Sequence, residues 1–360
     1  MRRAFLILLL AALAPMAMDG ADARAIVPPG PRLAFVVFHP YPHLGSEVAT
    51  VDASGGAPLR LSGGPGSTAV GPIDGARPSW AADGSALAFV GVAGSRSGAI
   101  YVVDADGTHL RLVRASRGII FEGNPVLAPD GRSVAVMRLD VISGHFERPG
   151  PGAARSRRDG GVKARTAIWS LDVEGRGMHP LTRWRRDRVL FPSSYSPDGS
   201  ALAATRVVFR GADRAQAVSI DLHGGRAALL AKNASDPVYA PDGRVAAVRD
   251  HIVKEKGPLE AIRVNSSDLL VGSPGSPLAT VLSVSGGLNW PSWDPSGQRI
   301  AFTRLNDQGG SPLGLIKIDS IEEVNADGTC PTTVPSLRRG FFSGAAWQPG
   351  LDRGAGRLAC

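Results

Sequence analysis

The sequence predicts an all-β fold, specifically a β-propeller of six four-stranded antiparallel blades. Three observations predict it: a turn-and-strand phrase recurs along the chain, its copies are spaced as propeller blades are, and turn residues are abundant. The chain has 360 residues, 43% of them hydrophobic and 20% charged, which is an ordinary composition for a globular protein with a packed core. Its 45 glycines and 28 prolines make up about a fifth of the residues. Such a content is typical of a chain with many tight turns between short strands.

The recurring phrase consists of an aromatic or apolar residue, a turn of the Ser-Pro-Asp-Gly type and a short apolar run. Its clearest copy begins at Ser194 and reads SYSPDGSALAATR. The other copies are PSWAADGSALAFV from Pro78, PVLAPDGRSVAVMR from Pro125, PVYAPDGRVAAVRD from Pro237, PSWDPSGQRIAFTR from Pro291 and the shorter GAAWQPG from Gly344.

We call the residue that precedes each turn the anchor. The anchors are separated by intervals of 47, 68, 44, 54 and 54 residues, and they are Trp80, Leu127, Tyr195, Tyr239, Trp293 and Trp347. Periods of this length are typical of propeller blades or of solenoid units.

The copy around Trp80 shows what one unit contains. Pro78–Trp80 reads as a short strand, and Ala82–Gly84 as a turn in which Asp bonds its own backbone and Gly accepts a positive φ. Leu87–Val90, Ala99–Val103 and Leu110–Val113 read as three further strands. Four antiparallel strands in so short a stretch predict a blade rather than a solenoid coil, and no helical period of 3.6 is visible.

The two ends of the chain predict how the ring closes. The N-terminal block RLAFV (32–36), EVATVDASGG (47–56) and PLRLS (58–62) lacks a first strand, whereas the last copy, GAAW, supplies a first strand alone. We expect the N- and C-terminal strands to share one blade, which removes exposed sheet edges. Five internal blades and this shared blade make six.

Two stretches interrupt the blade pattern. Residues 145–165 are rich in Gly, Pro and Arg and are predicted to be a basic loop insertion. Over residues 257–279 the pattern blurs.

Residues 1–25 have the pattern of a secretory signal peptide. Two arginines precede the apolar run Ala4–Met18, and an Ala-Arg-Ala segment ends at Ala25, so we expect cleavage before Ile26. The apolar run is short for a membrane span. We therefore expect an exported protein, periplasmic or extracellular and not membrane-spanning after cleavage, with a single propeller domain over 26–360.

The mature chain is expected to be basic. Without residues 1–25 it has 37 basic and 30 acidic side chains, a formal charge of +7. Such a balance favours anionic partners, and the alternative is a solvated arginine-rich surface.

The repeated motifs resemble the TolB-like propeller repeat, a WD40-like repeat. The features that carry the resemblance are the aromatic anchor before S-P-D-G-x-x-[IVL]-A-[FV], the [VI]-x-[DN]-A-D-G-[TS] hairpin and the terminal Trp-Gln-Pro, over residues 31–349. The resemblance implies the fold and says much less about function. TolB has an α/β domain before its propeller, which we do not find here, so its role in the Tol–Pal machinery is not carried over. Similar propellers precede a hydrolase domain in prolyl oligopeptidase-type peptidases, and no such domain follows here.

Motifs for catalysis or cofactor binding are not found in the sequence. There is no Gly-x-Ser-x-Gly elbow, no His-Glu-x-x-His, no phosphate-binding glycine loop and no cysteine cluster for zinc. We expect no cofactor and no metal site. We also expect no nucleic-acid partner, because the chain is exported.

One candidate binding site follows from propeller geometry. First strands line the central channel, and we expect the residues three positions before the anchors near the channel mouth, where propellers bind ligands. The candidates are Arg77, Asn124, Asp236 and Trp290. The alternative is that these side chains bond channel water and one another.

A second candidate site is a basic patch. Its residues lie in the insertion and beside Trp184, and they are Arg155, Arg157, Arg158, Arg185 and Arg186. Such a patch would suit an anionic envelope polymer, an acidic lipid or an acidic protein face. The alternative is a solvated loop of a basic protein.

The chain has two cysteines, Cys330 at a turn-to-strand junction and Cys360 at the last position. In an exported protein they are candidates for one disulfide, which would staple the C-terminal tail. Two free thiols or an intermolecular bond are the alternatives.

Together these features predict a non-enzymatic, monomeric binding or scaffold protein of the bacterial cell envelope or exterior, with an envelope or secreted protein as its partner. Two other functions stay open. One is a propeller enzyme, a lyase or hydrolase with its site at the channel mouth, and the other is an accessory propeller to a separate hydrolase.

Overall fold

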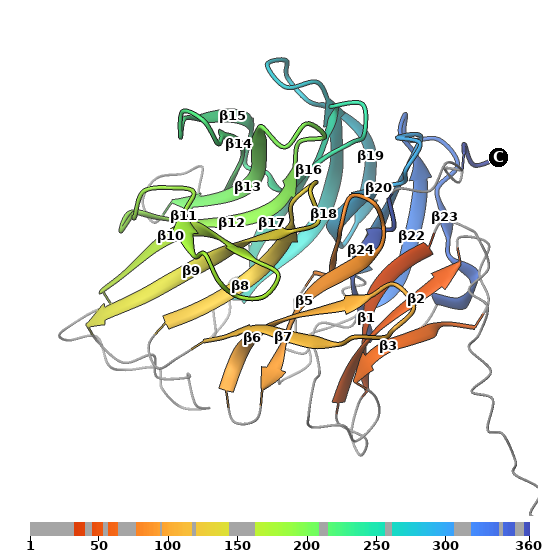
Figure 1. Cartoon of the computed structure of the whole chain (residues 1–360). Helices are drawn as coiled ribbons and strands as arrows, with labels where there is room; N and C mark the ends of the chain where they lie inside the picture. Colours follow the sequence, from red (N-terminus) through yellow and green to blue (C-terminus); the bar gives the residue numbers. More distant parts are fainter. Residues whose placement is uncertain are drawn as a thin grey trace, which may run out of the picture.

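The computed structural model describes residues 32–39, 45–52, 57–63, 77–93, 96–116, 120–143, 163–208, 215–255, 261–305, 318–337, 341–349 and 356–360. These residues form six four-stranded antiparallel sheets, arranged as the blades of a ring (Figure 1). Among them the only helical element is a short 3-10 turn, η1 (Pro335–Leu337). The predicted all-β, six-bladed propeller is confirmed.

One blade, called the closing blade, combines both ends of the chain. Its strand order is β24-β1-β2-β3, and its strands are β24 (Phe341–Trp347), β1 (Arg32–His39), β2 (Gly45–Asp52) and β3 (Leu59–Gly63). In the antiparallel register of β1 and β24, Leu33 lies opposite Trp347 and Phe38 opposite Phe341. The predicted closure, with a C-terminal first strand and N-terminal second to fourth strands, is therefore confirmed.

The other five blades follow in chain order. Blade 1 holds β4 (Ser79–Trp80), β5 (Ala86–Ala93), β6 (Arg96–Asp104) and β7 (Arg111–Ala115); blade 2 holds β8 (Ile120–Leu127), β9 (Ser133–Ser143), β10 (Lys163–Asp172) and β11 (His179–Pro180). Blade 3 holds β12 (Arg188–Tyr195), β13 (Ala201–Val208), β14 (Ala215–Asp221) and β15 (Ala227–Lys232). Blade 4 holds β16 (Ser235–Tyr239), β17 (Val245–Glu255), β18 (Ala261–Gly272) and β19 (Ala279–Ser285); blade 5 holds β20 (Gly287–Trp293), β21 (Arg299–Leu305), β22 (Ile318–Asn325) and β23 (Thr332–Thr333).

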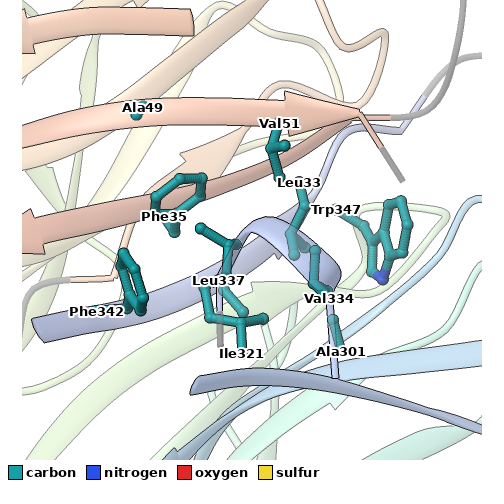
Figure 2. Close-up of a cluster of buried hydrophobic side chains, with 11 residues drawn as sticks. Leu33, Phe35, Ala49, Val51, Ala301, Ile321, Val334, Leu337, Phe342 and Trp347 are labelled. Carbon is teal, nitrogen blue, oxygen red and sulfur yellow. The ribbon is translucent and has the colours of Figure 1, made fainter. Parts of the chain in front are cut away.

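A buried apolar cluster holds the closing blade against blade 5 (Figure 2). The ring of Phe35 meets that of Phe342 edge-on, with 5.7 Å between their centroids, so β1 and β24 are joined by side chains as well as by backbone bonds. Ile321 and Leu337, from β22 and η1, extend the cluster (Figure 2). Burial of one such side chain contributes about 1.5–3 kcal/mol, so this cluster is a main source of ring closure.

The turn between the third and fourth strands of blade 2 docks against blade 1. At its tip Gly175 has a φ of +81°, and a Cβ at this position would lie 2.1 Å from the carbonyl oxygen of Val113 in β7. The turn glycine is thus needed for both its backbone conformation and its close approach to the next blade.

The C-terminal tail lies along the corresponding turn of blade 5, and the chain end is beside β22 and β23 (Figure 1). Cys330 and Cys360 form a disulfide with a Cα–Cα distance of 5.0 Å. The backbone N–H of Leu358 donates to Asn325 Oδ1 at 2.7 Å, and Arg357 pairs with Asp327 at 2.6 Å. Because β24 lies between the two cysteines in the chain, the disulfide closes a loop that contains the ring-closing strand.

Parts of the two stretches that interrupt the repeat lie in strands. Residues 163–165, at the end of the predicted insertion, belong to β10, where Arg165 pairs in register with Asp140 of β9. Residues 145–162 lie outside the described residues. The blurred stretch at 257–279 contains the long strand β18 and a turn at 273–276. The predicted signal peptide, 1–25, lies outside the described residues. No helix in the described part of the chain has the length and apolar character that a membrane span needs.

Candidate functional site

A funnel of about 510 Å³ lies on the ring axis, at the end that carries the first turns of the blades. All six anchors line it, together with turn prolines from five repeats: Trp80, Leu127, Tyr195, Tyr239, Trp293, Trp347, Pro129, Pro197, Pro241, Pro295 and Pro349. Cavities of this size with apolar and aromatic walls accommodate small molecules or short peptide segments.

Hydrogen bonds between neighbouring blades hold the anchors in the funnel wall. A serine one position before the anchor accepts the backbone N–H of the next blade's anchor: Leu127 N to Ser79 Oγ at 3.2 Å, Tyr239 N to Ser194 Oγ at 2.8 Å, and Trp347 N to Ser292 Oγ at 2.9 Å. The repeated Pro-Ser-Trp and Ser-Ser-Tyr triplets therefore link pairs of blades.

Two indole N–H groups make further links in the same direction, from an anchor to the preceding blade. Trp80 Nε1 donates to the carbonyl of Ala346 at 3.0 Å, and Trp293 Nε1 donates to that of Val238 at 3.2 Å. Each tryptophan is thereby oriented by the preceding blade. The funnel wall is consequently preorganised, which lowers the entropy lost when a ligand binds.

The four residues predicted for the channel mouth lie together, but deeper than the funnel. Arg77, Asn124, Asp236 and Trp290 line one small cavity of about 20 Å³. A space of this size holds about one water molecule rather than a ligand. Arg77 also lines the funnel, so the cavity lies directly beside it.

Three of these four residues have a left-handed backbone. Asn124, Asp236 and Trp290 have φ values of +51°, +50° and +53°, each precedes a proline, and each lies at a register shift between the first and second strands of its blade. Asn and Asp tolerate this conformation, whereas a bulky residue such as Trp rarely adopts it. The bulge turns these side chains toward the cavity and away from the strand pairing.

Charges at the cavity are partly compensated. Burial lowers the pKa of Arg77 to about 10, against the opposing field of Asp236. Burial raises the pKa of Asp236, opposed by the Arg77 charge and by a hydrogen bond from the Trp290 backbone N–H. Arg77 donates to the carbonyl of Pro291 at 3.0 Å, and the Asp236 N–H donates to Thr205 Oγ1 at 2.8 Å. The first contact joins blade 1 to blade 5, and the second joins blade 4 to blade 3.

The predicted basic patch is described only in part. Arg185 and Arg186 are exposed on the linker between β11 and β12, whereas Arg155, Arg157 and Arg158 lie outside the described residues. Arg185 pairs through its backbone with Thr166 of β10, so the linker is held against blade 2.

A constellation that resembles a hydrolase triad lies on the outer strands of blade 4. Ser283 Oγ donates to Asp268 at 2.7 Å, and His251 Nε2 lies 2.8 Å from the same carboxylate. The carboxylate is in the middle, so the serine does not bond to the histidine as a nucleophile bonds to its base. Within the described ranges, no three His, Cys, Asp or Glu side chains gather as metal ligands would.

Comparison with solved structures relates this ring to known propellers. The fold matches TolB from Acinetobacter baumannii with a TM-score of 0.60 and 19% identity, covering 89% of this chain and 67% of that one. It also matches a putative TolB from Agrobacterium tumefaciens, with a TM-score of 0.53, 15% identity, and coverage of 89% and 98%. The chain has a TolB-like propeller fold.

Similarity of this propeller to other proteins is limited to the fold. Hydrazine synthase from Kuenenia stuttgartiensis matches with a TM-score of 0.55 and 13% identity, over 90% of this chain and 47% of that one. Comparisons with known protein families and with curated proteins find no match.

Sequence reasoning about this TolB-like propeller missed the groups that shape the funnel. The funnel is lined by the anchors themselves, by the turn prolines and by serines such as Ser193 and Ser194, none of which is among the predicted site residues. The signal was present, because each of these residue types recurs at a fixed offset in the repeats. These residues form a cavity only because six segments that are far apart in the chain meet at one axis.

Proposed function

We propose that this chain is an exported, non-enzymatic binding propeller of the cell envelope or exterior, which holds a segment of an envelope or secreted protein in its funnel. The observation that carries the proposal is the funnel of about 510 Å³, lined by all six anchors and preorganised by bonds between blades. Preorganised apolar and aromatic pockets with few convergent polar groups are typical of ligand-binding sites, and aromatic-lined grooves are one way in which proteins recognise peptide segments.

The chemistry of the funnel wall favours binding over catalysis. Among the described lining residues, the ionisable side chains are Arg77, Tyr195, Tyr239 and Asp294. Asp294 accepts three hydrogen bonds within its own turn, from Ser296 Oγ and from the backbone N–H groups of residues 298 and 299. Burial raises the pKa of Tyr195 and of Tyr239. This set provides aromatic surface and hydrogen-bond donors, and it lacks a base placed beside a nucleophile.

Photo-crosslinking in intact cells tests the proposal. A photoreactive residue at Ala82, which is exposed and lines the funnel, should yield one dominant, saturable protein adduct. The matched control places the same residue at Glu174, an exposed position in the second turn of blade 2, and should yield none of that adduct. The exported protein should begin at Ile26 when its N-terminus is sequenced.

Other outcomes favour the alternatives. If position 82 yields no protein adduct at any salt concentration, the funnel does not hold a protein segment, and small-molecule screening for lyase or hydrolase turnover follows. If the adduct is a hydrolase whose activity depends on this chain, the accessory-propeller function is favoured instead.

A further inference from the structure

A second large cavity lies outside the ring axis, in the crevice between blade 2 and blade 3. It has a volume of about 1000 Å³. One wall is the linker from β11 to β12, and the other is formed by β13, β14 and the turn after β14. We call this the interblade groove. Its floor is aliphatic, made by Leu181, Leu190, Ile220 and Leu222.

The linker wall is rigid although it contains no long strand. The backbone of Arg185 exchanges two hydrogen bonds of 2.8 Å with Thr166 of β10, and Thr182 Oγ1 accepts the N–H of Ile168 at 2.9 Å. The ring of Trp184 packs against that of Trp169, with 5.8 Å between their centroids. The guanidinium of Arg165 lies 4.4 Å from the centroid of the Trp184 ring. The arginines on this wall are therefore presented from a fixed backbone.

The groove is strongly cationic. Its lining includes the basic side chains Arg183, Arg185, Arg188, Arg206 and His223, and no Asp, Glu, Asn or Gln side chain. A nearby carboxylate, Asp187, is bonded to Arg188.

Three of the arginines form no ion pair with a described carboxylate, although the charge of Asp187 acts on Arg185 and Arg206. These arginines are Arg183, Arg185 and Arg206, and the Nε of Arg206 donates to the neutral amide of Gln216 at 2.7 Å. Burial, followed by the like charge of Arg188, lowers the pKa of Arg206, and the charge of Asp187 opposes this shift. An anion in the groove would relieve this repulsion.

We propose that the interblade groove binds an extended acidic segment of a partner protein, in which carboxylates alternate with apolar side chains. The carboxylates meet the arginine rim, and the apolar side chains cover the leucine and isoleucine floor. Two features favour a peptide over an acidic polysaccharide. The floor is aliphatic, and the lining offers sugar hydroxyls no carboxylate or amide acceptor. The site is separate from the funnel and does not depend on the function proposed there.

The experiment is selection from a random-peptide phage library on the full exported chain. The enriched peptides should carry Asp or Glu together with apolar residues, and a fluorescent copy of the best peptide gives a Kd by anisotropy. Arg183→Ser with Arg185→Ser should weaken that Kd by roughly tenfold, because two charge-assisted contacts are lost. Raising the salt from about 0.05 M to about 0.5 M should also weaken it.

The matched control is Arg132→Ser with Arg176→Ser. Both arginines are exposed and neither lines the groove, so their loss should leave the Kd unchanged while removing the same two charges. Circular dichroism and urea unfolding establish that each variant folds. Because both groove substitutions replace exposed side chains, they should fold normally.

Three results would overturn the proposal. The first is enrichment of neutral or basic peptides, and the second is an equal loss of affinity in the control variant and in the groove variant. The third is binding of labelled polygalacturonate that requires Arg183 and Arg185 while no acidic peptide binds. The last result would assign the groove to an anionic polysaccharide.

Discussion

The docking of the second turn of blade 2 onto blade 1 can be tested at a single glycine. Gly175 has a φ of +81°, and a Cβ there would lie 2.1 Å from the Val113 carbonyl oxygen, where ordinary contact begins at 3.4 Å. Gly275, in the corresponding turn of blade 4, has a φ of +87° and nothing within 4 Å of an added Cβ. The pair therefore separates backbone conformation from close packing.

Alanine should cost different amounts at the two positions. A left-handed conformation costs an L-residue about 1–2 kcal/mol, which is the whole cost expected for Gly275→Ala. Gly175→Ala must also push the turn away from β7 by more than 1 Å, since the gap to ordinary contact is larger than that. Overpacking of this kind adds about 1–3 kcal/mol, so the total is about 2–5 kcal/mol.

Equilibrium urea unfolding of the wild-type chain and both variants measures these costs, provided that all three share one slope. Equal losses at the two positions would refute the reasoning, because they would mean that the turn of blade 2 does not rest on Val113. A loss at Gly275 that exceeds the loss at Gly175 would do so more strongly.

Two further predictions concern blade 5 and the C-terminal tail that is bonded to it. Burial raises the pKa of Glu323 from 4.5 to about 7, and the charge of Arg299 opposes this shift. Between these two pH values the folded state holds a proton that the unfolded state has lost. The resulting stabilisation is therefore fully present below pH 4.5, declines as the pH rises toward 7, and amounts to about 3 kcal/mol. Urea unfolding at pH 5 and pH 8 should therefore show a larger drop for wild type than for Glu323→Gln, and parallel drops would contradict the assignment. Replacing Cys330 and Cys360 with Ser should lower the free energy of unfolding by about 3.6 kcal/mol, as expected for a sequence separation of 30. The wild-type protein should show no reactive thiol before reduction, and two reactive thiols would contradict the disulfide.

Much of the fold could be read from local patterns in the chain. The anchor-and-turn phrase around Trp80 or Tyr195 specifies a strand, a turn and a second strand, because Pro, Asp and Gly set the turn conformation within a few residues. The missing first strand before Arg32 and the isolated last strand at Phe341–Trp347 identified the shared blade. These are properties of short segments and of their order.

The candidate site was predicted less completely. Arg77, Asn124, Asp236 and Trp290 were expected to lie together, and they do, but around a cavity that holds about one water molecule. The number of residues between a side chain and its anchor does not determine how deep in the channel that side chain lies. It depends on the bulge that gives Asp236 and Trp290 a positive φ, and on how far the facing strands extend.

The class of fold, the number of blades and the closure of the ring could be predicted from the amino-acid sequence, because strand period and turn chemistry are local. Where a ligand could fit depends on packing between distant segments. The funnel forms because anchors 44 to 68 residues apart meet at one axis, and the interblade groove forms because the linker carrying Arg183 and Arg185 faces Arg206 across a crevice. Space between segments distant in the chain is set by packing, and packing depends on all the side chains that meet there.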